Sequence, residues 1–146
     1  MDLSQRLLED HRHLRASLAC VTAMLDKPCN SGWEDRQSLD AALLSRNAAR
    51  LFADFKSHEE FEQRILLPLV RRMADGGFLA KSVDDSHRGI EQITRLFEAV
   101  CELCDGEHVY RVRSVLLRLQ DELESHLDFE EQRLFPRLGV LATNAS

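Results

Sequence analysis

The sequence has no apolar run long enough to cross a bilayer, because the longest, residues 65–70, is interrupted by Pro68. The first ten residues, MDLSQRLLED, carry charges where a signal peptide needs an apolar core. We therefore expect a cytoplasmic protein without a membrane partner. In that compartment the four cysteines are expected to be thiols rather than a disulfide framework.

A surplus of positive charge is also lacking. Nineteen basic residues stand against 25 acidic ones, which gives a net charge of −6, and no block of five or six like charges occurs. Nucleic-acid and anionic-membrane surfaces need concentrated positive charge. We therefore expect no nucleic-acid partner.

Proline and glycine are scarce, with three and six residues in 146. Their turn-like segments, KPCNSG (27–32), ADGG (74–77) and CDGE (104–107), separate four longer stretches. The length predicts a single domain, residues 1–146, with a core at about 3–138 and a short tail at 139–146.

Apolar residues in these four stretches recur with the spacing of amphipathic helices, and no stretch alternates as a strand does. The expected buried faces are Leu7, His11, Leu14, Leu18, Val21 and Leu25; Leu44, Leu51, Phe55, His58, Glu62, Ile65 and Leu69; His87, Ile90, Thr94, Phe97 and Cys101; and Val112, Leu116, Leu119, Leu123, His126, Glu130 and Leu134. Short connections predict an all-α fold, an up-down-up-down antiparallel four-helix bundle. We expect Pro68 to bend or end the second helix. We also expect the segment SVDD (82–85) to form a capping box that opens the third.

One segment occurs twice. HEEFEQRILLP (58–68) and HLDFEEQRLFP (126–136) share their His, Phe-Glu, Leu and Pro positions. HRHL at His11 and HRGI at His87 are a weaker pair. Each half of the chain is thus expected to be a helix hairpin, and the two hairpins to form a pseudo-repeat.

His and Glu four residues apart lie on one helix face, and in both copies that face is the apolar one. Burying such groups costs several kcal/mol unless something compensates, and a cation satisfies imidazoles and carboxylates together. At about 1.5 Å per residue, the six groups fall at heights of roughly 24–36 Å in the bundle. The predicted metal ligands are His11, His58, Glu62, His87, His126 and Glu130. Six ligands are too many for one tetrahedral zinc and favour a pair of ions, with iron first and manganese or zinc less favoured.

This arrangement over four helices resembles the hemerythrin-like family of non-haem di-iron proteins, from about Leu3 to Leu138. The resemblance implies that the six residues hold two iron ions bridged by oxo or hydroxo and by the two carboxylates. The oxygen-carrying members have a second His where this chain has Glu91. They also have an Asp five residues after the last His, where this chain has Glu130 at four. The chain is more similar to bacterial members linked to nitric oxide, peroxide, iron handling and repair of iron–sulfur centres.

We therefore expect a protein that binds or senses a small molecule, oxygen, nitric oxide or peroxide, with a protein partner if it signals. The alternative is a di-iron enzyme that decomposes peroxide or nitric oxide, or a factor that donates iron to damaged iron–sulfur centres. A bundle with a merely structural metal is less favoured. No general base stands out beyond the six ligands, so the catalytic residues, if any, are unknown.

Several neighbouring residues allow more than one interpretation. His11 is favoured over His13 because it lies on the Leu14–Leu18 face. The missing His leaves either an open position or an acid, although we expect Glu59 and Glu91 to face solvent. Phe61 and Phe129 are expected to wall the site. Cys101, Cys104 and His108, with Cys29, would meet at the opposite end of the bundle, where they could hold zinc, be redox active or simply fill space.

Overall fold

The structure is a computed structural model that describes residues 2–24, 41–102 and 109–138. These residues form helices, without a strand among them, and the turn at residues 71–75 connects two of them. The long helices are α1 (Leu3–Ala23), α3 (Ala41–Phe61), α5 (Gly76–Glu102) and α6 (Val109–Phe129). Shorter pieces are the π-helical turns η1 (Glu62–Leu66) and η2 (Glu130–Leu134) and the helix α4 (Leu67–Val70). The prediction of an all-helical protein with four long helices is confirmed.

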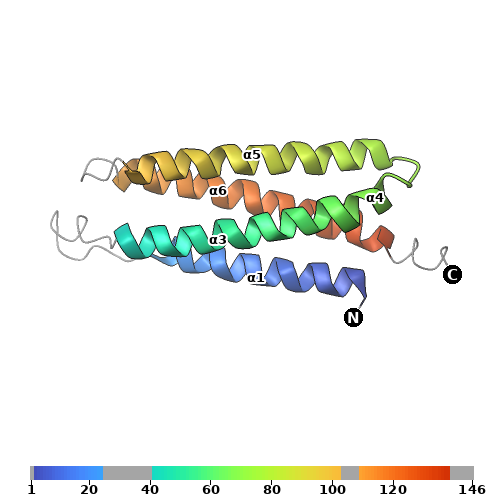
Figure 1. Ribbon diagram of the computed structural model, residues 1–146, viewed down its shortest axis with the longest axis horizontal. Helices are drawn as coiled ribbons and strands as arrows, with labels where there is room; N and C mark the ends of the chain where they lie inside the picture. Colours follow the sequence, from blue (N-terminus) through green and yellow to red (C-terminus); the bar gives the residue numbers. More distant parts are fainter. Residues whose placement is uncertain (1, 25–40, 103–108, 139–146) are drawn as a thin grey trace.

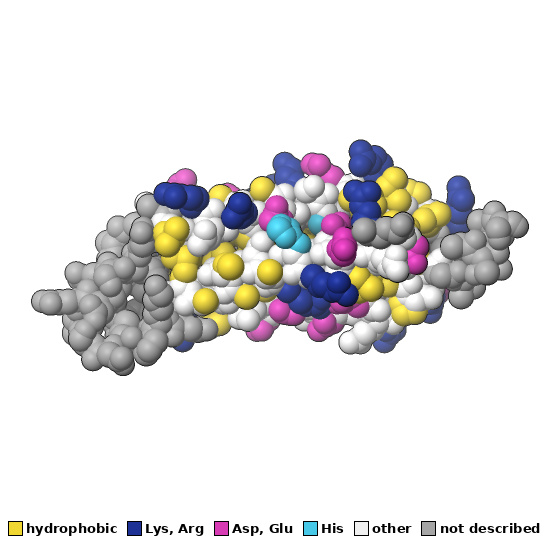
Figure 2. Space-filling model, turned by 90° about the horizontal axis from the view of Figure 1, so that it is seen from below, with side chains coloured by type: hydrophobic (Ala, Val, Ile, Leu, Met, Phe, Trp, Pro, Cys, Tyr) yellow, Lys and Arg dark blue, Asp and Glu magenta, His cyan; other side chains and the backbone are white. Residues whose placement is uncertain are grey.

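The four long helices lie side by side (Figure 1). α1 packs against α3 and α5 against α6, while α1 also contacts α6 and α3 contacts α5. In Figure 1, α1 and α5 run toward the left-hand end, and α3 and α6 run back from it. Acidic and basic side chains are interspersed on the face seen in Figure 2, without a continuous patch of either sign. None of the described helices combines the length and apolarity that a membrane span requires.

The helix faces follow the predicted periodicity along most of the chain. Leu7, His11, Leu14, Leu18 and Val21 are buried along α1. The helix begins with a capping box in which the Asp2 side chain accepts a hydrogen bond from the Gln5 backbone N–H at 2.8 Å. Leu25, the last residue predicted for this face, lies outside the described residues.

The predicted start of the third helix is wrong. α5 begins at Gly76, six residues before Ser82, and the Ser82 hydroxyl donates to the Phe78 carbonyl inside the helix at 3.0 Å. Such a bond to the preceding turn is a common alternative to capping for serine. Gly76 serves a close approach: a Cβ there would lie 1.9 Å from the Val70 carbonyl oxygen. The glycine therefore permits the tight connection from α4 to α5 rather than breaking the helix.

Pro68 is predicted to bend or end the last turn of the second helix, and that helix ends at Val70, two residues after Pro68. α4 continues directly from η1, so Pro68 lies inside a continuous helix rather than at a free helix start. Before it, the Leu67 N–H donates to the Glu62 carbonyl, five residues back. This π-turn inserts one extra residue and shifts the buried face to Leu66, Leu67 and Val70. Ile65, predicted to be buried, is therefore 39% exposed.

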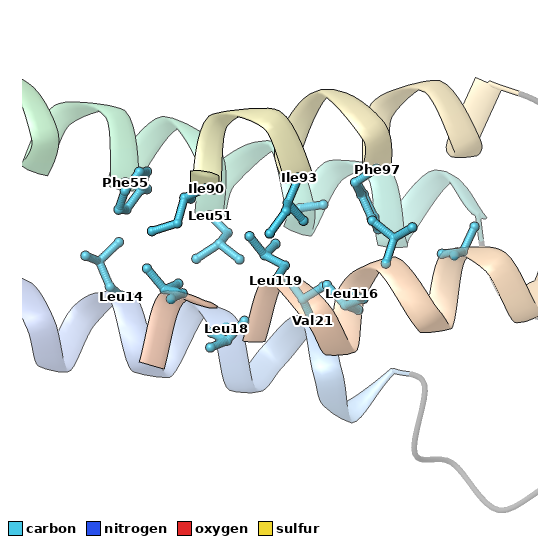
Figure 3. Close-up of a cluster of buried hydrophobic side chains, with 14 of the residues drawn as sticks. Leu14, Leu18, Val21, Leu51, Phe55, Ile90, Ile93, Phe97, Leu116 and Leu119 are labelled. Atoms are coloured by element: carbon cyan, nitrogen blue, oxygen red, sulfur yellow. The ribbon is translucent and has the colours of Figure 1, made fainter. Parts of the chain in front are cut away.

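Within the described part of the bundle, two apolar clusters are separated by charged and polar side chains. The larger cluster, part of which is drawn in Figure 3, includes Leu14, Phe55, Ile90 and Leu123. The smaller one includes Leu7, Leu66, Val83 and Leu134. Between these two levels, each long helix or the π-turn that continues it contributes to one set of buried polar residues, called here the polar layer: His11, His58, Glu62, His87, His126 and Glu130.

Candidate metal centre

The polar layer is built by all four long helices. α1 contributes His11 and α5 contributes His87. His58 and His126 lie in the last turns of α3 and α6, and Glu62 and Glu130 are the first residues of the two π-turns that follow. Every member is at most 4% exposed. The structure thus brings together all six residues that the sequence singled out.

Four members form a first group in which the donor atoms lie within 4.8 Å of one another: His11, His58, Glu62 and Glu130. The Nε2 atom of His11 is 3.3 Å from Oε1 of Glu130. The Nε2 atom of His58 is in close contact with Oε1 of Glu62 and lies 3.8 Å from Oε1 of Glu130. Two imidazoles and two carboxylates therefore point at one small volume.

Glu62, His87 and His126 form a second group by the same criterion. Oε2 of Glu62 is 3.5 Å from Nε2 of His87, and Oε1 of Glu62 is 3.8 Å from Nε2 of His126. Nε2 of His126 also approaches Oε1 of Glu130, at 3.0 Å. Glu62 belongs to both groups, which is the arrangement expected of a carboxylate that bridges two cations.

Hydrogen bonds do not satisfy the polar layer. Eleven of its buried side-chain nitrogen and oxygen atoms make no bond of acceptable geometry, and these are the unsatisfied buried side-chain atoms of the described part of the chain. Buried polar atoms normally have partners, because an unpartnered one costs about 1–3 kcal/mol. The donor set, imidazole nitrogen and carboxylate oxygen, is one that borderline divalent metals accept. The residues therefore fit a metal cofactor.

Without a metal, burial and close contacts shift the pKa values of several side chains in the layer away from their ordinary values. Burial, reinforced by neighbouring His58, lowers the pKa of His11 to about 4. Burial would also lower the pKa of His58, but contacts with Glu130 and Glu62 outweigh it and raise that pKa to about 10. Burial and the charge of Glu62 raise the pKa of Glu130, whereas contacts from Glu130 and three histidines hold the pKa of Glu62 low against burial. Protons and ion pairs thus compensate the cost of burial for only some of the six side chains.

A comparison with protein families points the same way as the donor set. The model of the hemerythrin HHE cation-binding domain matches residues 2–138. The chain belongs to the hemerythrin HHE cation-binding family. No curated protein and no solved structure gives a significant match.

In this hemerythrin HHE domain, carboxylates outside the polar layer face three of the four imidazoles. Nδ1 of His58 lies 3.4 Å from Oδ2 of Asp10, and Nδ1 of His11 lies 3.6 Å from Oε2 of Glu131. Nδ1 of His87 is 3.9 Å from Oε1 of Glu59. Such carboxylates orient metal-binding imidazoles and raise their basicity. Nδ1 of His126 is buried without a hydrogen-bond partner.

The sequence interpretation missed Asp10, Glu131 and Arg15. Arg15 reaches Glu131 with two bonds, of 2.6 and 3.1 Å, and so fixes the carboxylate that faces His11. A signal was available, because Asp10 precedes His11 and Glu131 follows Glu130 directly. Sequence adjacency alone does not say which imidazole each would face.

The aromatic walls of the layer differ from the prediction. Phe55 contacts the rings of His87 and His126 edge-on, with centroid distances of 5.8 and 6.1 Å, and Phe135 lies 4.9 Å from the ring of His11. Phe61 and Phe129 instead pack against the smaller apolar cluster, with Arg6 stacked on Phe61 at 4.2 Å. The reason is helical position: each Phe precedes its Glu by one residue and so faces about 100° away from it.

The remaining candidates lie outside the layer. His13 is on the surface, where it approaches Asp54 at 3.2 Å. Glu91 is exposed and Glu59 half-buried, so the expectation that both face solvent holds fully only for Glu91. Cys101 is half-buried against the larger apolar cluster, whereas Cys29, Cys104 and His108 lie outside the described residues.

Proposed function

We propose that this domain binds two iron ions through His11, His58, Glu62, His87, His126 and Glu130, and uses them to bind oxygen, nitric oxide or peroxide. The observation that carries the proposal is the set of eleven unsatisfied polar atoms, all on these six residues. Two cations, sharing Glu62, would give partners to the four Nε2 atoms and the four carboxylate oxygens of this set. The pseudo-repeat has a simple meaning in this account, since each hairpin supplies a lone His and a His-x-x-x-Glu pair.

Iron is preferred because of the donor set. Four imidazoles and two carboxylates are harder than the thiolate-rich sets of structural zinc sites, and they suit iron, with manganese or zinc as weaker alternatives. A pair of iron ions would supply open coordination positions for a small molecule and electrons to reduce it. The protein's part is to orient the imidazoles and to exclude water, which the two apolar clusters and the rings of Phe55 and Phe135 do from either side.

The small-molecule proposal rests on how few ligands the second group has. Glu62, His87 and His126 supply three donor side chains, with Glu130 near His126 as the one further carboxylate, and Glu91, which replaces the second His of oxygen carriers, is exposed. Six-coordinate iron at this group would have room for an added ligand. This favours binding of a diatomic molecule or peroxide over a sealed structural site.

The same observation favours a second candidate, an iron donor for damaged iron–sulfur centres, because an ion with few protein ligands is easily released. An enzyme that decomposes peroxide or nitric oxide would use the same open position. Turnover separates these candidates: reversible, stoichiometric spectral change indicates binding, sustained consumption indicates an enzyme, and transfer of iron to an apo-acceptor indicates a donor.

The first test is metal content with an absorption spectrum, measured on protein expressed in iron-replete medium. We expect about two irons per chain and near-ultraviolet bands that change on addition of oxygen, nitric oxide or peroxide. His58→Ala and His126→Ala should each lose at least one iron, while His13→Ala, the surface control, should keep both. Zinc alone, no metal, or two irons retained in either ligand variant would overturn the proposal.

A further inference from the structure

We propose that the two metal positions are unequal. A first ion binds tightly at the group formed by His11, His58, Glu62 and Glu130, and a second, exchangeable ferrous ion binds at the group formed by Glu62, His87 and His126. The inference rests on the proposed function, because it concerns how iron is distributed between the two groups.

The first reason is the number and charge of the donors. In the first group both carboxylates lie close to both imidazoles, whereas in the second Glu62 lies close to both imidazoles and Glu130 approaches only His126, at 3.0 Å. Affinity for divalent cations rises with the number and the charge of the ligands. The first ion to enter therefore takes the position at which both carboxylates lie close to both imidazoles.

The second reason is the support behind the imidazoles. Both histidines of the first group face a carboxylate through Nδ1: His58 shares a hydrogen bond of 3.4 Å with Asp10, and His11 lies 3.6 Å from Glu131, an ion-pair distance without a hydrogen bond. Arg15 fixes one of these carboxylates, Glu131, from the far side at 2.6 Å. The hydrogen bond orients His58 before any metal arrives, and the anchored carboxylate of Glu131 attracts the ring of His11, which lowers the cost of binding.

The carboxylate support behind the second group is weaker. His87 has only Glu59, at 3.9 Å, and Nδ1 of His126 is buried without a hydrogen-bond partner. An imidazole whose other nitrogen is unpartnered is less basic and less firmly oriented. Both reasons therefore assign the weaker position to the α5–α6 side of the layer, where His87 and His126 pack edge-on against Phe55.

Stepwise loading separates unequal from equal sites. Metal-free protein is titrated anaerobically with ferrous ion, and the zero-, one- and two-iron species are counted by native mass spectrometry. At one equivalent, sites that differ a hundredfold in affinity give about 80% one-iron protein, whereas equal, independent sites give about 50%. We expect the one-iron species to predominate clearly.

The other outcomes are distinct. A mixture near the statistical value, or only zero- and two-iron species, would overturn the inequality and leave the proposed two-iron centre standing. Failure to bind any ferrous ion would overturn the proposed function itself.

Variants locate the tight position. His87→Ala should keep one iron with affinity close to that of the first ion in the unaltered protein, and His11→Ala should lose that tight binding. Circular dichroism of each metal-free variant shows whether the helices remain. Equal first-iron affinities in the two variants would contradict the assignment.

Matched substitutions test the positioning residues. Asp10→Asn and Glu131→Gln should weaken the first iron about 10- to 100-fold, the usual effect of removing an outer carboxylate. Glu59→Gln should leave the first iron unchanged and weaken only the second. The same effect on both irons from all three variants would indicate a general structural role and overturn the proposal.

Discussion

The larger apolar cluster and the polar layer lie on the same helices and are equally buried, yet their chemistry is opposite. Leu51 and Glu62 are separated by three turns of one continuous helix and are 1% and 0% exposed. Leu51 is among apolar side chains from all four long helices. Glu62 is among imidazoles and a second carboxylate, and neither of its oxygens makes a hydrogen bond.

The difference teaches what each region needs from outside the chain. Apolar contacts stabilise the folded state in water without a partner. The polar layer, by contrast, contributes favourably only when its atoms are satisfied, because buried groups left unpaired cost free energy. One region therefore reports on folding and the other on metal binding, and substitutions should separate the two.

The largest effect is expected from Glu62→Ala, because Glu62 belongs to both groups. We expect loss of both irons, measured as metal per chain. The exposed neighbour Glu60 provides a control on the adjacent position, and Glu60→Ala should keep both ions. Retention of one firmly bound iron in Glu62→Ala would mean that Glu62 does not bridge the two groups.

Leu51→Ala should have the converse effect. Truncating a fully buried leucine removes packing and leaves a cavity, at a cost of about 2–5 kcal/mol in the free energy of unfolding. The metal content should stay at two per chain, since Leu51 lies outside the polar layer. Denaturant unfolding and metal analysis of the same preparation check both statements, and loss of iron would show that the two regions are not separable.

Much of this contrast could be predicted from the sequence. Periodicity located the buried faces of the long helices, and the two His-x-x-x-Glu segments marked the polar layer, because spacing along a regular helix determines which residues share a face. The prediction from periodicity failed at Ile65, because the π-turn adds one residue there and the assumed 3.6-residue period no longer holds. The contact between Glu131 and His11 also could not be predicted, since it depends on how α1 sits against the end of α6.

The helix start at Gly76 shows a different limit. Two glycines and a following Ser-x-x-Asp segment favoured a turn and a later cap, each on sound local grounds. The close approach of Gly76 to Val70 decided otherwise, and that contact exists only once α4 and α5 are placed. Local signals were outweighed by tertiary packing.

A smaller effect, of opposite sign, is expected when part of the layer is made apolar. His126→Leu combined with Glu130→Leu replaces a buried pair, 3.0 Å apart, by side chains like those of the neighbouring clusters. Such replacements are neutral or stabilise by about 1–4 kcal/mol. We expect the metal-free double variant to unfold at a higher temperature than the metal-free unaltered protein, and to bind fewer irons. A marked loss of stability would mean that the layer is satisfied without metal.

The smallest effect concerns pH, and it separates the regions because the apolar cluster has no titrating group. In the metal-free protein the pKa of His58 is raised to about 10, so its stabilisation is complete below its unfolded pKa of about 6.5 and is lost as the pH rises toward 10. The pKa of His11 is lowered to about 4, so its contribution is present above about pH 6.5 and is lost as the pH falls toward 4. The melting temperature of the metal-free protein should therefore be highest near neutral pH. In His58→Ala the alkaline decline should flatten, while in Leu51→Ala the whole curve should shift down with its shape unchanged. An alkaline decline of the same depth in His58→Ala would place its origin outside the polar layer.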